Sequence, residues 1–388
     1  MPREDYVERA RGLGPLLERA APQMERERQL TAEVVAALHD AGLYRIMLPR
    51  SLGGAELPPA DFVEVIETVA RADASTAWCL GQAGGCAFAA AYLEPATARE
   101  VFGPRDAVLA WGPPNSSGRA RPVDGGYVVN GTWQFASGSR HATWLGAHAA
   151  RVDAEGKPPA GPARPMSEPT LLFPRSSATI IDTWRVIGLK ATGSDTYTVK
   201  DLFVPASHVL QRDDPATRRE PGPLYRFTNF QLYGAAFAGV ALGIARTVQD
   251  RFIALAREKT PFLASAALRD SPAIQLQVAL SEVKLRAARL FLLDTLRSAY
   301  DEAARDGAIS LDRRVALRLA STSATMQARE VVDACYQAAG ATAIFETNPF
   351  ERRFRDMHAV AQQSQARPSQ LESAGRILLG FDTLAYAL

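Results

Sequence analysis

A run of aromatic and hydroxyl residues near the middle of the chain could hold a flat heterocyclic ring. The segment from Asn130 to Gly138 reads Asn-Gly-Thr-Trp-Gln-Phe-Ala-Ser-Gly. On a strand, Trp133 and Phe135 would point to the same face, and Ser137 would continue that face beyond the strand end. The rings would contact the ligand while the Ser137 hydroxyl donates to a ring heteroatom. The spacing alone is more typical of a half-buried strand with core aromatics.

Other catalytic signatures are missing. The sequence contains no GxGxxG, GxxxxGK[ST], HExxH or GxSxG motif. The five histidines lack metal-ligand spacing apart from His141 and His148, whose separation of seven residues in a β region need not bring the side chains together. The three cysteines are an odd number without a CxxC pair, so we expect neither a metal site nor a disulfide framework. The glycines between Gly81 and Gly85 lie in an apolar run with no preceding strand, which indicates helix packing or a turn rather than a phosphate loop.

Helices are expected over roughly the first hundred residues. Thr31 fits an N-cap, and Gly42 fits the end of the same helix. Asp61 and Glu64 have the spacing of a capping box. An apolar stripe at helical spacing follows that box: Phe62, Val65, Ile66 and Val69.

The pattern changes to strands near Ala107 and returns to helices after 213–223. A turn at 124–126 precedes a β-rich run over 127–135, and further strands are predicted at 170–173, 179–187 and 196–204, with an exposed loop at 153–168. Long helices follow, at 230–257, at 272–304 after Ser271, and at 314–339 before Gly340. This order predicts an α+β chain with a helical domain (1–107), a β-barrel or sandwich domain (108–215) and a helix bundle (216–388), and it excludes Rossmann and TIM arrangements.

Composition limits the partners. The 388 residues are 47% hydrophobic and 22% charged, with a net charge of +2. Such a chain should fold as two or three domains, and its balanced charge argues against nucleic acid as a partner. The acidic N-terminus has no apolar signal segment, and the apolar run from Ala83 to Leu93 is shorter than the roughly 20 residues that span a bilayer. We therefore expect a cytoplasmic protein without a membrane partner.

Six segments in order resemble the acyl-CoA dehydrogenase superfamily. They are the Leu-Pro and Leu-Gly-Gly of 48–54, Asp-Gly-Gly-Tyr-Val-Val-Asn-Gly-Thr at 124–132, Gly-Leu-Lys-Ala-Thr-Gly-Ser at 188–194, Phe-Val-Pro at 203–205, and the C-terminal pair 336–340 and 351–356. The resemblance covers essentially the whole chain. It implies an acyl-CoA dehydrogenase-like fold with an N-terminal helical domain, a middle β-barrel, a C-terminal four-helix bundle, a flavin between barrel and bundle, and a homotetramer.

The resemblance also implies roles for individual residues. The backbone from Trp111 to Ser117 would line the pyrimidine edge of the flavin. Trp133, Phe135, Ser137 and Gly138 would adjoin the isoalloxazine, with Phe135 and Ser137 near its reactive nitrogen. Arg257 and Phe262 would reach the cofactor phosphate from a neighbouring subunit, while Gln337 and Gly340 would approach the cofactor across a subunit interface. An Arg fork matches a phosphate, and glycine lets the backbone come close.

Two activities of the superfamily differ in what they require. Acyl thioester dehydrogenation needs a carboxylate to remove a proton while the flavin takes a hydride. The segment 357–367, where many dehydrogenases carry that glutamate, holds no acid, which leaves only residues elsewhere in the bundle: Glu258, Glu282 or Glu372. An FAD-dependent acyl-CoA dehydrogenase therefore remains the alternative.

The segments 355–358 and 372–380 resemble the flavin-dependent monooxygenase branch. Its members take reduced FMN or FAD from a separate reductase and use O2 to oxygenate a small aromatic or heteroatom-containing substrate. This chemistry needs a shielded apolar pocket and a donor near the flavin, and Ser137 fits the donor. Four residues could line the substrate pocket, although core packing accounts for such residues more often: Trp78, Cys86, Phe88 and Met357.

The chain departs from that branch at two positions. Members often carry histidine in the segment matching 84–88 and again near Gln362, and this chain has neither. His358 is the remaining candidate for an acid or base, or else a residue of the helix surface. The sequence thus predicts a flavin-dependent monooxygenase with Ser137 and His358 as catalytic residues, and a catalytically inactive homologue is a second alternative.

Overall fold

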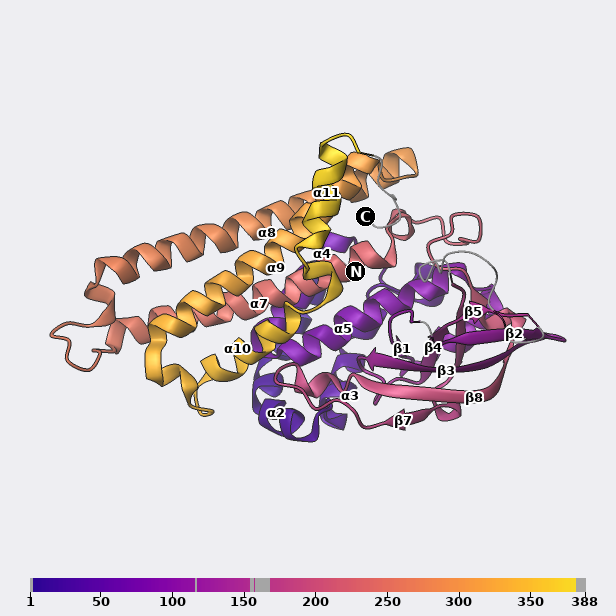
Figure 1. Ribbon diagram of the computed structural model, residues 1–388, viewed down its shortest axis with the longest axis horizontal. Helices are drawn as coiled ribbons and strands as arrows, with labels where there is room; N and C mark the ends of the chain where they lie inside the picture. The colour runs from indigo at the N-terminus through magenta and orange to yellow at the C-terminus, as the bar shows by residue number, and fades with distance from the viewer. Residues whose placement is uncertain (1–2, 116, 154–156, 158–167, 382–388) are drawn as a thin grey trace.

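The computed structural model describes residues 3–115, 117–153, 157 and 168–381, and its elements follow the predicted order of helices, sheets and helices (Figure 1). Most of the predicted loop at 153–168 lies outside these residues. Within them, no helix is long and apolar enough to cross a membrane. The N-terminal helices are α1 (Arg3–Gly12), α2 (Gly14–Glu27), α3 (Ala32–Asp40), α4 (Pro59–Ala72), α5 (Ala74–Ala87) and α6 (Pro95–Phe102).

Two of these helices test the predicted caps. The Thr31 hydroxyl accepts a hydrogen bond from the Val34 amide, and α3 ends just before Gly42, whose φ of 73° is left-handed, as expected. The capping box at Asp61 is wrong. Helix α4 begins two residues earlier at Pro59, where proline has the φ of a first helical turn, and Asp61 lies inside that turn. The predicted apolar stripe of α4 is buried.

The middle region contains two sheets, ordered β1-β4-β6-β9 and β5-β2-β3-β8-β7. Pairing is antiparallel except for β1 with β4 and β2 with β5. Gly125, with a φ of 73°, makes the predicted turn into β3. The predicted strand at 179–187 is too long, since pairing ends at Ile181. The strands are β1 (Leu109–Trp111), β2 (Arg119–Val123), β3 (Gly126–Ala136), β4 (Trp144–His148), β5 (Ala150–Arg151), β6 (Thr170–Pro174), β7 (Thr179–Ile181), β8 (Asp195–Pro205) and β9 (Val209–Leu210).

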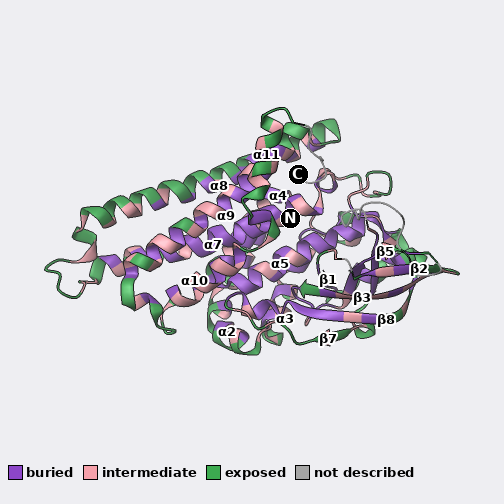
Figure 2. Cartoon of the chain, viewed as in Figure 1, coloured by how far each residue is buried: buried purple, intermediate pink, exposed green. Residues whose placement is uncertain are grey.

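Long antiparallel helices form the C-terminal bundle. Thr228 and Gln231 make a reciprocal capping box at the start of the first of them, and Gly340 follows the last residue of the third, as predicted. Figure 2 shows that the outer helix α8 carries much of its exposed surface away from the core. The helices are α7 (Asn229–Glu258), α8 (Pro272–Asp306), α9 (Leu311–Ala339), α10 (Pro349–Val360) and α11 (Ser369–Leu378).

Helix α5 packs against both α7 and strand β1, so it joins the bundle to the sheets. Its glycines permit that approach. A Cβ at Gly85 would lie 2.2 Å from the Tyr233 ring, and one at Gly84 would lie 2.5 Å from the Phe62 ring. The glycine run is therefore a helix-packing feature, as the sequence indicated. The domain limits at 107 and 215 stay a prediction.

Candidate active site

A bulge at the end of β3 separates the two aromatics that the sequence placed on one face. The β3–β8 register shifts between Trp133 and Ala136, and Phe135 takes a left-handed φ of 60°. Trp133 is fully buried, stacks on Tyr197 and donates its indole N–H to the His148 carbonyl, whereas Phe135 is 58% exposed. The prediction of a shared face is wrong, because one extra residue in a strand reverses the alternation. Trp133 is a core residue.

Phe135 forms an exposed platform at the strand end. The Trp184 ring meets it edge-on at 6.1 Å between centroids, and Ile187 nearby in the sequence is 65% exposed. A phenylalanine with positive φ is strained by roughly 1–3 kcal/mol, and such strain concentrates at functional sites. The strained backbone presents a flat apolar surface that the described residues leave more than half exposed.

Ser137 lies behind this platform and is 6% exposed. Its Oγ lies 2.9 Å from Trp78 Nε1, which donates to it, and 2.7 Å from Ser194 Oγ. Ser194 Oγ is in turn 2.6 Å from Thr192 Oγ1, which donates to the Leu189 carbonyl at 2.8 Å. Since each hydroxyl carries one proton, this last bond requires Ser194 to donate to Thr192 and Ser137 to donate to Ser194. The Ser137 proton therefore points inward.

The Leu189 end of this hydroxyl chain is fixed by the bundle. Asp356 on α10 accepts a hydrogen bond of 2.7 Å from the Leu189 amide, and burial raises the pKa of this carboxyl from 3.8 to about 6. The indole N–H of Trp184 donates to the Leu189 carbonyl. One continuous path of hydrogen bonds thus links α10, the segment before β8, Ser137 and α5.

An accessible seam runs from Ser137 between α5 and α7. Every residue of α5 is buried except Trp78 and Gln82, which lie one turn apart on one face. Opposite them on α7, half-buried Tyr233 and buried Phe237 are also one turn apart. Trp78 stacks on Phe237 with 3.7 Å between ring centroids, and Phe237 stacks on Tyr233 at 5.6 Å. We call these four residues the α5–α7 seam.

The far end of the seam contains Cys86 and Trp111. Cys86 is fully buried, with its sulfur 3.5 Å from the Tyr233 hydroxyl, and burial raises the pKa of its thiol to about 12. Gln82 donates to the Trp111 carbonyl at 3.1 Å. The predicted pocket residues Trp78 and Cys86 thus share one face of α5, and Trp111 adjoins them.

The structure separates other predicted residues from this seam. Phe88 is a core residue against Tyr225, at 5.2 Å between ring centroids. Met357 is fully buried in α10. His358 lies two positions beyond Asp356, about 200° around the helix, so it faces α9, where its Nε2 is 2.9 Å from Asp333 Oδ1. No hydrogen bond in the described ranges joins His358 to Ser137.

Ser117 and Gly138 lie beside the β3 end. Ser117 is exposed, and its hydroxyl donates to the Thr132 carbonyl at 2.6 Å. Gly138, with a φ of 79°, donates its amide to the Thr192 carbonyl at 2.9 Å. The Ser117 hydroxyl and the Gly138 amide are thus both engaged with backbone carbonyls of the middle region.

Four predicted cofactor residues lie at the opposite end of the bundle. Arg257 lies in the last turn of α7, Phe262 follows that helix with 93% exposure, and Gln337 and Gly340 lie where α9 ends. Lys259 ties the two segments together by donating to the Ala339 carbonyl at 2.6 Å. Figure 1 shows this tip far from the sheets. Within one chain, the tip cannot meet the Phe135 platform.

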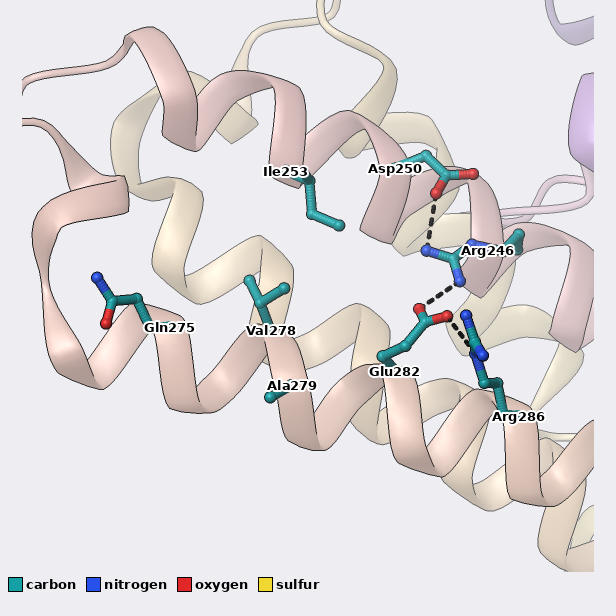
Figure 3. A pocket seen from close by; sticks show the side chains of 8 residues that line it. All are labelled: Arg246, Asp250, Ile253, Gln275, Val278, Ala279, Glu282 and Arg286. Carbon is teal, nitrogen blue, oxygen red and sulfur yellow. Dashed lines mark hydrogen bonds and ion pairs between the residues drawn. The ribbon is translucent and has the colours of Figure 1, made fainter.

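Within the described ranges, none of the three acids considered for dehydrogenase chemistry forms a hydrogen bond with Ser137. Glu258 is exposed at the tip, and Glu372 is exposed on α11. Glu282 bonds to Arg246 and Arg286 beside a cavity of about 630 Å³ between α7 and α8 (Figure 3). The charges drawn in that cavity pair with one another, so it offers no base that is free to remove a proton from a substrate.

Comparison with known proteins decides the family. Residues 16–98 match the acyl-CoA dehydrogenase N-terminal domain, and residues 235–368 match a C-terminal domain of the same name. The chain is 31% identical to an indole-3-acetate monooxygenase of Pseudomonas putida, over 92% of this chain and 89% of the relative. It belongs to the acyl-CoA dehydrogenase superfamily, in its flavin-dependent monooxygenase branch. A resorcinol hydroxylase oxygenase component of Rhizobium, described as FADH2-dependent, is 28% identical over 93% of this chain and 90% of that relative.

Solved structures of monooxygenases have the same fold. The 3-HSA hydroxylase of Rhodococcus superposes with a TM-score of 0.90 at 25% identity, over 99% of both chains. XiaF of Streptomyces, solved with FADH2 and glycerol, gives 0.90 at 25% identity, over 98% of this chain and 96% of that one. The predicted fold and family are confirmed. The exposed, strained Phe135 beside a hydroxyl suits the flat apolar ring of the flavin that this branch uses.

The sequence interpretation missed Phe237, Tyr233, Ser194 and Thr192. The aromatic pair at spacing four in a Gly/Ala-rich helix was a usable signal, because large rings there must face small residues of a neighbouring helix. The hydroxyls carried no such signal, since their convergence on Ser137 depends on how β3 and the start of β8 pair.

Proposed function

We propose that this protein is the oxygenase component of a two-component monooxygenase that acts on a small aromatic or heteroatom-containing substrate. A separate reductase would supply reduced FMN or FAD as the source of two electrons. One atom of O2 would enter the substrate and the other would leave as water. A cytoplasmic location is part of this proposal.

The single observation that carries the proposal is the pairing of the exposed Phe135 platform with Ser137 at the mouth of an aromatic seam. The bound flavin supplies the chemistry that activates O2. Phe135 would support its ring, and Ser137 would hold a proton at Oγ, beside the ring. Trp78 and Phe237 would orient the substrate and exclude water, which protects reactive oxygen chemistry from side reactions.

For Ser137 to donate outward, its hydroxyl chain must reverse. Thr192 would then donate to Ser194 and Ser194 to Ser137, which frees the Ser137 proton. The oxygen separations of 2.6 and 2.7 Å allow this change by hydroxyl rotation alone. The chain therefore offers an oriented donor without the missing histidines or a strong base.

A homo-oligomer, expected to be a tetramer, is also part of the proposal. The tip with Arg257, Phe262, Gln337 and Gly340 can assist a flavin only on another copy. Helix α8 supports such association with an exposed apolar stripe at helical spacing, each member 44–65% exposed: Leu276, Leu280, Val283, Leu290 and Phe291. Light scattering coupled to size exclusion would test this, and a monomer at micromolar concentration would contradict it.

The activity itself is tested by isotope incorporation. The purified protein, a flavin reductase, nicotinamide cofactor, and FMN or FAD would be mixed with a panel of phenols and indoles under ¹⁸O₂. One ¹⁸O atom per product molecule supports the proposal. A yellow protein that acyl-CoA bleaches without oxygen would instead support the dehydrogenase alternative, and failure to bind any flavin would support the inactive homologue.

A further inference from the structure

Arg212 is a buried cation with an unused donor at the far end of the α5–α7 seam. It lies just after β9 and is 6% exposed. Its Nε donates to the Thr170 hydroxyl at 2.7 Å, and its guanidinium lies over the Trp111 ring at 5.6 Å. Its Nη2 has no hydrogen-bond partner within the described ranges. Burying a charged donor without a partner is costly, which points to a ligand.

The acids near Arg212 do not supply an acceptor for its Nη2. Asp213 and Glu168 both act electrostatically on Arg212, but the Asp213 carboxylate accepts from the Asn229 amide at the start of α7, and neither acid forms a hydrogen bond or ion pair with Arg212 within the described ranges. Glu168 Oε2 is itself buried there without a hydrogen-bond partner. Across Thr170, the buried His148 uses Nδ1 at 2.9 Å from the same hydroxyl, and its Nε2 also has no partner there. Two unpaired nitrogens thus share one buried corner.

This corner is connected to the seam. The Trp111 ring packs edge-on against His148 at 5.2 Å between ring centroids, and Gln82 of the seam donates to the Trp111 carbonyl at 3.1 Å. Arg212 acts electrostatically on Tyr233 and Cys86. Burial raises the pKa of Tyr233 well above its usual value, so its hydroxyl keeps a proton to donate. Arg212 therefore adjoins the far end of the seam through Trp111, whose ring lies under the guanidinium and whose carbonyl accepts from Gln82.

The spacing of Phe237 and Tyr233 along α7 indicates how long a ligand in the seam would be. Phe237 and Tyr233 are one helical turn apart, about 6 Å along α7. A ring against Trp78 and Phe237 would lie beside Ser137, and a short acidic arm on that ring would reach the level of Tyr233. Trp78, Gln82 and Tyr233 keep accessible surface on otherwise buried helical faces, so the two levels lie along one partly exposed face of the helix pair.

We propose that Arg212, assisted by Tyr233, binds the carboxylate of an aromatic acid whose ring lies against Trp78 and Phe237. A carboxylate accepts the parallel donors of a guanidinium and so uses its free nitrogen. The proposal rests on the proposed function, because it names the substrate class of the same site: arylalkanoic acids rather than neutral phenols.

Equilibrium binding tests this without turnover. Isothermal titration of the full-length protein, with and without flavin, would compare four acids with their neutral amides: phenylacetate, 3-phenylpropionate, indole-3-acetate and 2-naphthylacetate. We expect at least one acid to bind about 10- to 100-fold more tightly than its amide, as for a hydrogen bond to a charged group. Equal affinities in every pair, or no binding by any acid, would overturn the proposal.

Variants separate the Arg212 contact from general charge. Arg212→Gln should abolish the preference for the acid and leave the amide affinity within about twofold, while Arg212→Lys should keep part of it. Arg219→Gln is the matched control, since this exposed arginine in the same segment pairs with Glu94. Thermal melts would identify variants that fail to fold. Retention of the preference by a folded Arg212→Gln protein would contradict the assignment.

The two proposals can fail separately. An acid preference that depends on Arg212, without ¹⁸O incorporation, would support this subsite and reject the monooxygenase. Oxygenation of neutral phenols with no preference for acids would support the monooxygenase and reject the subsite.

Discussion

The two ends of the α5–α7 seam differ in whether their buried polar atoms have hydrogen-bond partners. At the Ser137 end, each hydroxyl has both a donor and an acceptor partner, and the path ends on Asp356 of the bundle. At the Arg212 end, two buried nitrogens have no partner within the described ranges. The first arrangement is stable in the free protein, while the second becomes satisfied when an acceptor arrives. A proton donor and a recognition site thus place different demands on the same protein interior.

The largest expected effect concerns the anchor of the satisfied end. Burial raises the Asp356 pKa to about 6, above the unfolded value of 3.8, so the folded protein binds this proton more tightly. Stability from this group is therefore greatest below pH 4 and is lost as the pH rises through 6, by up to ~3 kcal/mol. Asp356→Asn keeps the acceptor for Leu189 and cannot ionise. Urea unfolding at pH 4 to 7 should show a flatter profile for the variant, and identical profiles would contradict this.

The next effect tests whether Ser137 is the donor. Ser137→Ala removes the hydroxyl nearest the Phe135 platform and should lower product formed per reduced flavin on the order of 10- to 100-fold, with hydrogen peroxide released instead. The measurement is the ratio of product to peroxide. Ser139→Ala is the control, because that buried hydroxyl bonds to the Gly193 carbonyl and not to the Ser137 chain. A normal ratio in Ser137→Ala would remove Ser137 from the site.

A smaller effect is expected at Trp78. Trp78→Phe keeps a ring against Phe237 and removes only the N–H that donates to Ser137. Loss of one such bond costs about 1 kcal/mol, so we expect roughly a fivefold lower product-to-peroxide ratio. Equal ratios would show that the indole serves packing alone and that Ser137 is oriented by Ser194.

The smallest effect is expected at His358. Because its ring faces Asp333 on α9, His358→Ala should change the product-to-peroxide ratio by less than about twofold. A loss comparable to that of Ser137→Ala would show that α10 turns or moves when the complete site assembles. It would also restore the acid or base role that the sequence suggested.

The fold was predictable because its signals are local and repeated. Thr31, Gly42, Gly125 and the long apolar stripes each specify an element through nearby residues. The site was predicted less well, because its geometry depends on non-local pairing. Trp133 points into the core and Phe135 points outward because the β3–β8 register shifts between Trp133 and Ala136. The sequence around Phe135 contains no signal that would have predicted this bulge.

Arg212 is a second residue whose position the sequence could not predict. The Pro- and Arg-rich stretch that begins one residue later, 213–223, was expected to separate the strands from the long helices, and the chain does pass there between β9 and α7. What the sequence could not show is that this one arginine turns inward over Trp111 while Arg219 stays exposed. Burial of this side chain depends on contacts with Thr170 and Trp111, which are distant from it in the sequence.

The left-handed backbone at Phe135 has a consequence for protein engineering. Selection of variants for thermal stability alone would favour glycine or asparagine at this position. Both residues accept positive φ and would release roughly 1 kcal/mol or more of strain. The same change would delete the exposed ring. We therefore expect substitutions at position 135 to raise thermal stability and lower turnover. Libraries designed to stabilise this protein should keep Phe135 unchanged.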